Sequence, residues 1–213
     1  MKVGILGSGD VATALAKGFL AAGYEVKLGS RVVNNPKLAT FVRTIGGRAS
    51  AGTFADAAAF GDLVVLATLG TATSDAIKLA GVENFAGKVV LDTTNPLETA
   101  AGGVPRLVGG LGTSAGEKHQ TLLVNARVVK VFNTVGNALM YQPKLAGGPP
   151  DMFICGNDAQ AKTTVRELLA KFGWNTIDVG GIDASHYLEA MCLVWVLSAL
   201  KENTWMQAFK LLR

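Results

Sequence analysis

The sequence GSGDVA, at positions 7 to 12, restricts the possible fold more than any other feature of this chain. It follows an apolar run, Lys2–Leu6, that predicts a strand, and it leads into a helical pattern over Val11–Ala22. In this context Gly7 permits a tight turn, and Gly9 lets backbone N–H groups approach a diphosphate. The alanine that ends the motif allows close packing of the helix on the strand. The pattern predicts a strand–turn–helix unit whose helix N-terminus binds the diphosphate of a dinucleotide.

The rest of the chain alternates short apolar runs with helical stretches, which is typical of a parallel sheet with helices on both faces. Strands are expected at Lys2–Leu6, Glu25–Leu28, Arg48–Ala51, Leu63–Ala67, Val89–Leu91, Val128–Val131, Met152–Cys155 and Thr176–Val179. Helices are expected at Val11–Ala22, Pro36–Ile45, Phe54–Phe60, Thr73–Leu79, Ala159–Phe172 and Ala184–Leu211. We therefore expect an α/β fold, a Rossmann-type doubly wound and mostly parallel sheet. The dinucleotide-binding domain is expected over residues 1–181, and a C-terminal helical extension over 182–213.

The turn after the second predicted strand indicates which dinucleotide binds. Enzymes that use NAD normally place an acidic residue there to bind the ribose 2′-hydroxyl, but this chain has Ser30 and Arg31, and no acidic residue from Val26 to Ala55. A carboxylate would repel a 2′-phosphate, whereas the planar guanidinium of Arg31 can pair with it and Ser30 can donate a hydrogen bond. The turn predicts NADP(H), the alternative being a solvated surface arginine beside a serine turn.

Three further loops are expected to frame the nicotinamide, because ligands of open parallel sheets lie beyond the carboxyl ends of the strands. They contain Thr68 and Leu69, Asn95 and Pro96, and Asn133. Each could equally be a turn or a helix cap. The candidate cofactor-binding residues are Gly7, Ser8, Gly9, Asp10, Val11, Ser30, Arg31, Thr68, Leu69, Asn95, Pro96 and Asn133.

Composition argues against other classes of site. Cys155 and Cys192 lie far apart, without metal-ligand spacing, and are expected to be buried thiols in a reducing cytoplasm, so no metal site is expected. The net charge of +4 comes from scattered lysines and arginines, which does not predict nucleic-acid binding. No apolar stretch reaches the roughly 20 residues of a membrane-spanning helix, so membrane insertion is not expected. No catalytic group is assigned; His119 is expected on the surface, and His186 beside Tyr187 could reach the cleft.

The last 30 residues carry much apolar surface, and large apolar patches seldom stay open on monomers. The segment is expected to fold over the cleft, to pack against a second subunit, or to do both. If it covers the cleft, Met191 and Trp195 would line an apolar slot over the nicotinamide. Residues 140–150 are expected to form a surface loop that could act as a lid.

Four segments, MKVGILGSGDV at 1–11, LGSR at 28–31, DTTNPL at 92–97 and VKVFNT at 129–134, together resemble the NADP oxidoreductase family dependent on coenzyme F420, an 8-hydroxy-5-deazaflavin. The resemblance covers essentially the whole chain and extends to the NADPH-binding half of the six-transmembrane metal reductases. It implies hydride transfer between NADPH and a deazaflavin or flavin-like acceptor, in homodimers joined through C-terminal helices. Many deazaflavin-using members have Gly-Gly-Thr-Gly where this chain has Gly7–Asp10, which leaves the acceptor open.

Two other hypotheses stay open. One is an imine or carbonyl reductase resembling pyrroline-carboxylate reductases, which share the N-terminal domain but need a longer helical C-terminal domain and a proton donor. The other is a non-catalytic NADP(H)-binding redox sensor or partner protein, which would bind the nucleotide tightly without turnover. For the deazaflavin-linked oxidoreductase and for the imine or carbonyl reductase, the expected partner is a small-molecule redox acceptor.

Overall fold

The computed structural model describes residues 1–100, 103–110 and 112–212. Its strands are β1 (Lys2–Leu6), β2 (Glu25–Ser30), β3 (Ala49–Thr53), β4 (Leu63–Leu66), β5 (Val89–Asp92), β6 (Leu97–Thr99), β7 (Pro105–Leu107), β8 (Arg127–Lys130), β9 (Asp151–Gly156) and β10 (Asn175–Asp178). Its α-helices are α1 (Asp10–Ala21), α2 (Pro36–Ile45), α3 (Phe54–Phe60), α4 (Thr73–Ala80), α5 (Ala115–Leu122), α6 (Ala159–Lys171) and α7 (Ser185–Glu202). Short 3₁₀ turns are η1 (Gly70–Ala72), η2 (Val82–Phe85), η3 (Asn137–Leu139) and η4 (Ile182–Ala184).

Eight strands form one sheet in the order β10-β9-β8-β5-β4-β1-β2-β3. The pairs are parallel except β8 with β9, and in this register Val3 of β1 pairs with Val26 on one side and Leu63 on the other. The chain moves outward from β1 through β2 to β3 and then crosses to β4 on the other side of β1. The predicted Rossmann-type, doubly wound and mostly parallel sheet is confirmed.

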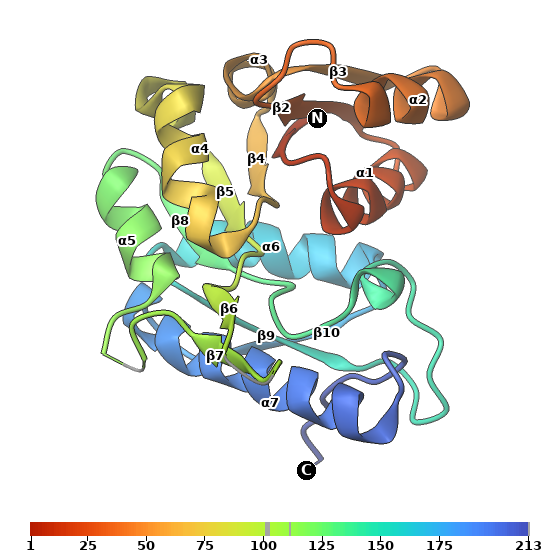
Figure 1. Ribbon diagram of the computed structural model, residues 1–213. Helices are drawn as coiled ribbons and strands as arrows, with labels where there is room; N and C mark the ends of the chain where they lie inside the picture. The colour runs from red at the N-terminus through yellow and green to blue at the C-terminus, as the bar shows by residue number, and fades with distance from the viewer. Residues whose placement is uncertain (101–102, 111, 213) are drawn as a thin grey trace.

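Helices cover both faces of the sheet, and a separate hydrophobic core lies on each face (Figure 1). One core contains residues of α1, α2 and α6, together with Phe172 at the C-cap of α6. The ring centroids of Phe172 and Phe19 lie 5.1 Å apart. The other contains residues of α3, α4 and α7, including Phe54 and Ile77. Burial on both faces explains why strands such as β4 are apolar at every position.

The structure differs from the sequence-based expectation in two segments between β5 and β8. Residues 97–99 and 105–107 pair as an antiparallel hairpin, β6–β7, and residues 115–122 form α5. A capping box starts α5, because Ser114 accepts a hydrogen bond from the Glu117 amide while the Glu117 carboxylate accepts one from the Ser114 amide. The hairpin and α5 follow the strand that precedes the expected nicotinamide loop.

The last helix is shorter than predicted. It ends at Glu202 rather than Leu211, because Asn203 adopts the left-handed conformation, with φ 50° and ψ 40°. The chain then turns back, and Gln207 exchanges two hydrogen bonds of 2.9 Å with Trp195. Figure 1 shows α7 along the lower side of the molecule, with the β6–β7 hairpin beside it.

The segment 140–150 packs against α6 and the tail. The Met140 carbonyl accepts a hydrogen bond from the Trp174 indole at 3.2 Å, and the Tyr141 ring lies 5.0 Å from Phe172. The Lys210 ammonium donates to the Gly147 carbonyl. A role as a lid stays a prediction.

Candidate functional site

A groove of about 440 Å³ opens beyond the carboxyl ends of β1, β2 and β4. This is where the strand order reverses around β1, the usual ligand position in open α/β sheets. Seven of the twelve residues predicted from the sequence line this groove, namely Gly7, Ser8, Gly9, Ser30, Arg31, Thr68 and Leu69. The remaining lining residues are Val32, Asn35, Phe54, Ala67, Ala72, Asp75, Ala76 and Leu79.

The two glycines of the first turn have different roles. Gly7 has φ 150°, and a Cβ atom placed on it would lie 2.3 Å from the Ala67 carbonyl oxygen, so the turn is packed directly against the end of β4. Gly9 has an ordinary φ of −89°, and a Cβ atom there would meet nothing within 4 Å. The absence of a side chain at Gly9 thus leaves free space above the backbone that a ligand can approach.

The first turn of α1 faces this space. Gly9 is the N-cap of the helix and supplies no side-chain capping hydrogen bond. The first amides of an α-helix have no partner within the helix, and the two predicted residues Asp10 and Val11 carry such amides here. The open backbone at Gly9 and these amides fit the diphosphate of a dinucleotide.

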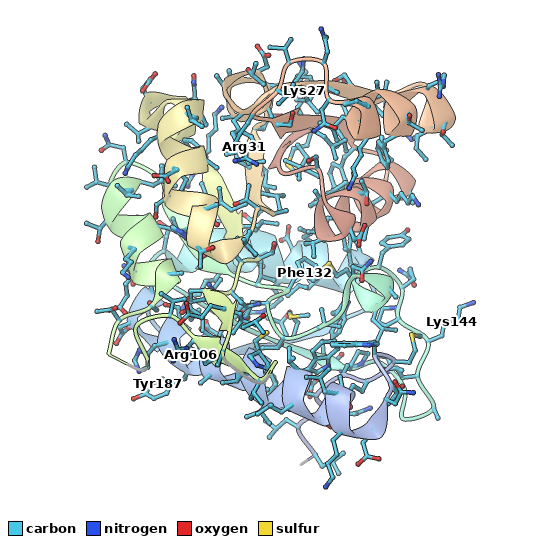
Figure 2. All side chains as sticks on the ribbon, in the orientation of Figure 1. Lys27, Arg31, Arg106, Phe132, Lys144 and Tyr187 are labelled. Atoms are coloured by element: carbon cyan, nitrogen blue, oxygen red, sulfur yellow. The ribbon has the colours of Figure 1, made fainter. Side chains whose placement is uncertain are left out.

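The turn after β2 forms a second wall of the groove, beside the first turn of α1. The Ser30 hydroxyl donates to the Val32 carbonyl at 2.6 Å and accepts from the Val32 amide at 3.2 Å, so it shapes the turn, and its expected contact with a phosphate stays a prediction. Arg31 is exposed at the groove, and Figure 2 shows it between α4 and the N-terminal elements. Asn35 caps α2 through the Lys37 amide, and its side-chain amide lies 3.5 Å from the Ser8 hydroxyl, which joins the two turns.

The third wall follows β4. The Thr68 hydroxyl lies 2.8 Å from that of Thr73, the first residue of α4, and Leu69 is exposed at the rim. A Cβ atom on the neighbouring Gly70 would lie 1.9 Å from the Asn95 carbonyl oxygen. This close approach brings the loop after β4 against the loop after β5.

Asn95, Pro96 and Asn133 form a second group beyond Gly70. The Asn95 side chain donates to the Asn133 carbonyl at 2.8 Å, and the Asn133 side chain donates back to the Asn95 side-chain oxygen at 3.0 Å. Phe132, just before, has φ 59°, an unfavourable conformation for a bulky residue, and it is fully buried (Figure 2). The structure therefore joins the ends of β5 and β8 through a pair of asparagine side chains.

Sequence reasoning missed a buried charged cluster beneath these loops. It consists of Asp92, His119, Lys130 and Glu189, each at most 2% exposed. The expected surface position of His119 is wrong, because its Nδ1 lies 2.9 Å from the Asp92 carboxylate. The only signal in the sequence is that an aspartate ends β5 and a lysine ends β8, both after apolar runs.

The charges in this cluster stabilise one another. Burial by itself raises the pKa of the Asp92 carboxyl, but the Lys130 ammonium and the contacts of His119 and Thr94 outweigh it and hold that pKa far below its usual range. Burial likewise lowers the pKa of Lys130, but Asp92 and Glu189 outweigh it and raise the pKa above its ordinary value. Asp92 and Lys130 are therefore an ionised pair at neutral pH.

The tail residues are placed differently from the expectation. Met191 lines a separate pocket beside Tyr187 and Phe153, whereas Trp195 is buried with its indole donating to the Gln207 carbonyl. The slot predicted between Met191 and Trp195 is therefore not formed by these two residues. The ring centroids of His186 and Tyr187 lie 3.8 Å apart with the ring planes tilted by 49°, and Tyr187 is exposed (Figure 2).

Other chemistry is not indicated within the described part of the chain. Both cysteines are free and buried, and burial raises the pKa of the Cys155 and Cys192 thiols to about 12, which makes them poor nucleophiles. Residues 1–100, 103–110 and 112–212 contain no cluster of His, Cys, Asp and Glu side chains suited to hold a metal ion. Over the same residues, no helix has the length and apolar character to cross a membrane.

Comparisons with known proteins find NADP-dependent oxidoreductases among the relatives of this chain. The family of NADP oxidoreductases described as coenzyme F420-dependent matches residues 2–96. Metalloreductase STEAP3 of Rattus norvegicus is 33% identical over 195 residues, 90% of this chain and 36% of that protein. The F420-dependent NADP reductase of Methanocaldococcus jannaschii is 34% identical over 140 residues, 64% of this chain and 61% of that protein. This chain thus spans less than two thirds of either relative.

A solved structure is similar over the full length. It is a protein of Arthrobacter sp. FB24 provisionally assigned as an F420-dependent NADP reductase, and it superposes with a TM-score of 0.93. The two sequences are 35% identical, and the match covers 100% of both chains. The likeness therefore includes α7 and the tail as well as the sheet.

Proposed function

The chain belongs to the coenzyme F420-dependent NADP oxidoreductase family, and on this premise we propose that it transfers hydride between NADPH and a deazaflavin or flavin-like acceptor. The proposal depends above all on one observation. A single groove joins the open backbone at Gly9 to the turn that carries Arg31 and no acidic residue. A diphosphate at the first turn and a 2′-phosphate at the second are the two anionic groups of NADP(H).

The groove accommodates the adenosine half of the cofactor in this proposal. The diphosphate lies on the first amides of α1, and the guanidinium of Arg31 pairs with the 2′-phosphate through its planar fork. Side chains of Val32, Phe54 and Leu79 line the same groove and offer an apolar surface to the adenine ring. Asp75 is the one acidic residue among the lining side chains.

The nicotinamide half reaches the loops that end β4, β5 and β8, with Thr68, Leu69, Asn95, Pro96 and Asn133 as its proposed neighbours. Bound NADPH supplies the hydride. The protein's part is to hold the ring in one orientation and to keep water from it, since transfer between two stacked rings moves charge within the rings themselves. The mutual hydrogen bonds of Asn95 and Asn133 favour a single geometry for this end of the site.

We also propose a homodimer in the cytoplasm. On α7 an apolar stripe at helical spacing, formed by Tyr187, Met191, Val194, Leu197 and Leu200, has four members more than 40% exposed. Such a stripe on one helix face suits a second copy packed helix against helix. Sedimentation velocity of the wild type and of Val194→Glu measures the oligomeric state. The control is Arg166→Glu, on the exposed side of α6. A monomeric wild type would refute the proposed homodimer.

Nucleotide titration by fluorescence tests the cofactor. We expect NADPH to bind more tightly than NADH, and Arg31→Ala to weaken NADPH about 10- to 150-fold, the value of a charge-assisted hydrogen bond of about 1.5 to 3 kcal/mol. NADH binding should stay unchanged, and so should the NADPH affinity of Arg43→Ala, which removes an exposed arginine of α2 outside the groove. Equal affinities for NADPH and NADH in the wild type would contradict the assignment.

A panel of acceptors tests the reaction. Oxidation of NADPH is followed at 340 nm with a deazaflavin, FMN and FAD, and with a cyclic imine. Rapid oxidation by a deazaflavin or flavin supports the proposal, and oxidation by the imine alone would favour an imine reductase. Tight NADPH binding without turnover on every acceptor would favour a redox sensor.

A further inference from the structure

Two neighbouring residues of α7 are connected to the two loops proposed to hold the nicotinamide. The Leu188 carbonyl accepts a hydrogen bond of 2.8 Å from the Asn133 side chain, which is also bonded to Asn95. Glu189 reaches the same loops through the buried charged cluster. Helix α7 thus contacts the loops of the proposed site directly, although it lies almost 100 residues beyond the loop after β5 in the sequence.

Glu189 is surrounded by hydrogen-bond donors. Its carboxylate accepts from the Lys130 ammonium at 2.7 Å, and from the amides of Ala115 and Gly116 at 3.1 Å each. These two amides belong to the first turn of α5, so Glu189 also binds the start of that helix. A carboxylate with three donors and 2% exposure has a single well-defined orientation.

Lys130 connects the fixed carboxylate of Glu189 to the loop after β5. Its ammonium lies 3.1 Å from the Asp92 carboxylate, whose other oxygen accepts from the Thr94 amide at 3.0 Å and the Thr94 hydroxyl at 2.7 Å. Thr94 directly precedes Asn95. A continuous series of buried contacts therefore connects Glu189 to the backbone of the proposed nicotinamide loop.

The packing around this series leaves little room for adjustment. A Cβ atom on Gly116 would lie 2.6 Å from the Ser185 hydroxyl oxygen, and the Ser114 and Ser185 hydroxyls are 2.5 Å apart. Both serines are fully buried. Because α5 and α7 meet at such short range, a change at Glu189 cannot be absorbed by a shift of either helix.

We propose that Glu189 is a positioning residue for hydride transfer, which sets the geometry of the Thr94–Asn95 loop through Lys130 and Asp92 without touching the dinucleotide. This inference rests on the proposed function. Its consequence is selective, because the series of contacts ends at the nicotinamide loop and not at the groove that receives the adenosine half. Loss of the Glu189 charge should therefore affect one half of the cofactor and spare the other.

The test compares Glu189→Gln with Glu202→Gln, which neutralises a carboxylate at the exposed end of the same helix. Two probes are titrated: adenosine 2′,5′-bisphosphate, which contains the adenosine half alone, and NADPH. For Glu189→Gln we expect unchanged affinity for the bisphosphate and about tenfold weaker NADPH binding, the loss of roughly one hydrogen bond at the nicotinamide. The emission of bound NADPH, which reports the surroundings of its ring, should shift toward that of free NADPH.

Thr94→Val keeps the test decisive if Glu189→Gln fails to fold. It removes one hydroxyl contact with Asp92, preserves the shape of the side chain, and should weaken NADPH but not the bisphosphate. The inference is overturned if the folded variants match Glu202→Gln in both titrations, or if both probes weaken equally. Wild-type protein that binds neither probe would instead refute the proposed function, so the two failures are distinguishable.

Discussion

Replacing Gly9 with alanine should separate cofactor binding from folding. The φ of −89° at Gly9 is accessible to alanine, and the added methyl group would meet nothing within 4 Å. The free energy of unfolding should therefore change by no more than about 1 kcal/mol, because the restriction of the unfolded chain by alanine opposes the poorer fit of alanine at an N-cap position. The methyl group would occupy the space above the first turn of α1 in which we place the diphosphate.

The expected loss of affinity follows from the contacts displaced. An amide-to-phosphate hydrogen bond is worth about 1.5 to 3 kcal/mol, so the loss of one such bond should weaken NADPH about 10- to 150-fold. Urea unfolding followed by tryptophan fluorescence measures the stability, and fluorescence titration measures the dissociation constant for NADPH. Both measurements use the same purified variant.

Gly7→Ala is the matched comparison, since it adds the same methyl group two residues earlier. There the Cβ atom would lie 2.3 Å from the Ala67 carbonyl oxygen at a φ of 150°, so overpacking and backbone strain should together cost about 2 to 5 kcal/mol of stability. If Gly9→Ala binds NADPH as tightly as the wild type, the diphosphate does not lie on this turn. If Gly9→Ala is destabilised as much as Gly7→Ala, the space above Gly9 is not open.

Three further predictions concern the scaffold. Asn203→Val should lower the free energy of unfolding by about 1 to 2 kcal/mol because a β-branched residue disfavours the left-handed conformation that ends α7, whereas Asn203→Gly should not, as urea unfolding can measure. With thiol pKa values of about 12, Cys155 and Cys192 should not react with a chromogenic disulfide at pH 8 until denaturant unfolds the chain, and rapid labelling of native protein would contradict their burial. The pKa of Asp92 is lowered from 3.8 because Lys130 and hydrogen bonds outweigh burial. The contribution of the Asp92 charge to the free energy of unfolding is therefore complete above about pH 4. It is lost as the pH falls further, because the unfolded chain takes up the proton first. Asp92→Asn should therefore cost about 3 to 5 kcal/mol at pH 7 and show a smaller deficit near pH 3 in urea unfolding, and an equal deficit at both values would refute the charge pairing.

The eight strands of the main sheet could be predicted from short apolar runs in the sequence, which are complete in a central strand such as β4 because both of its faces are covered. Each of them was expected within two residues of its observed bounds at either end. The glycine turn could also be predicted from the sequence. Gly7 has a φ and a close contact that a side chain would not tolerate, and at Gly9 a side chain would fill the open space above the backbone. Both signals are local: a few adjacent residues carry them, and the rest of the fold does not change their meaning.

The hairpin β6–β7 could not be found in this way. Its strands have three residues each, and Leu97–Thr99 and Pro105–Leu107 show neither a long apolar run nor a strict alternation. They are stabilised by pairing with each other, by contact of β7 with α7 and by contact of β6 with η1. The end of α7 was missed for a related reason, because the apolar residues after Asn203 suit the folded-back tail as well as they suit a helix.

The amino-acid sequence by itself determined the sheet, the glycine turn after β1 and the basic turn after β2, because each depends on conformational or chemical preferences of neighbouring residues. Tertiary structure alone decided the charged cluster, in which Asp92 and Glu189 lie 97 positions apart and meet through Lys130. A buried charge is unfavourable until its partners are in place. Those partners come from β5, β8, α5 and α7, so the favourable interaction arises only when all four elements have packed together.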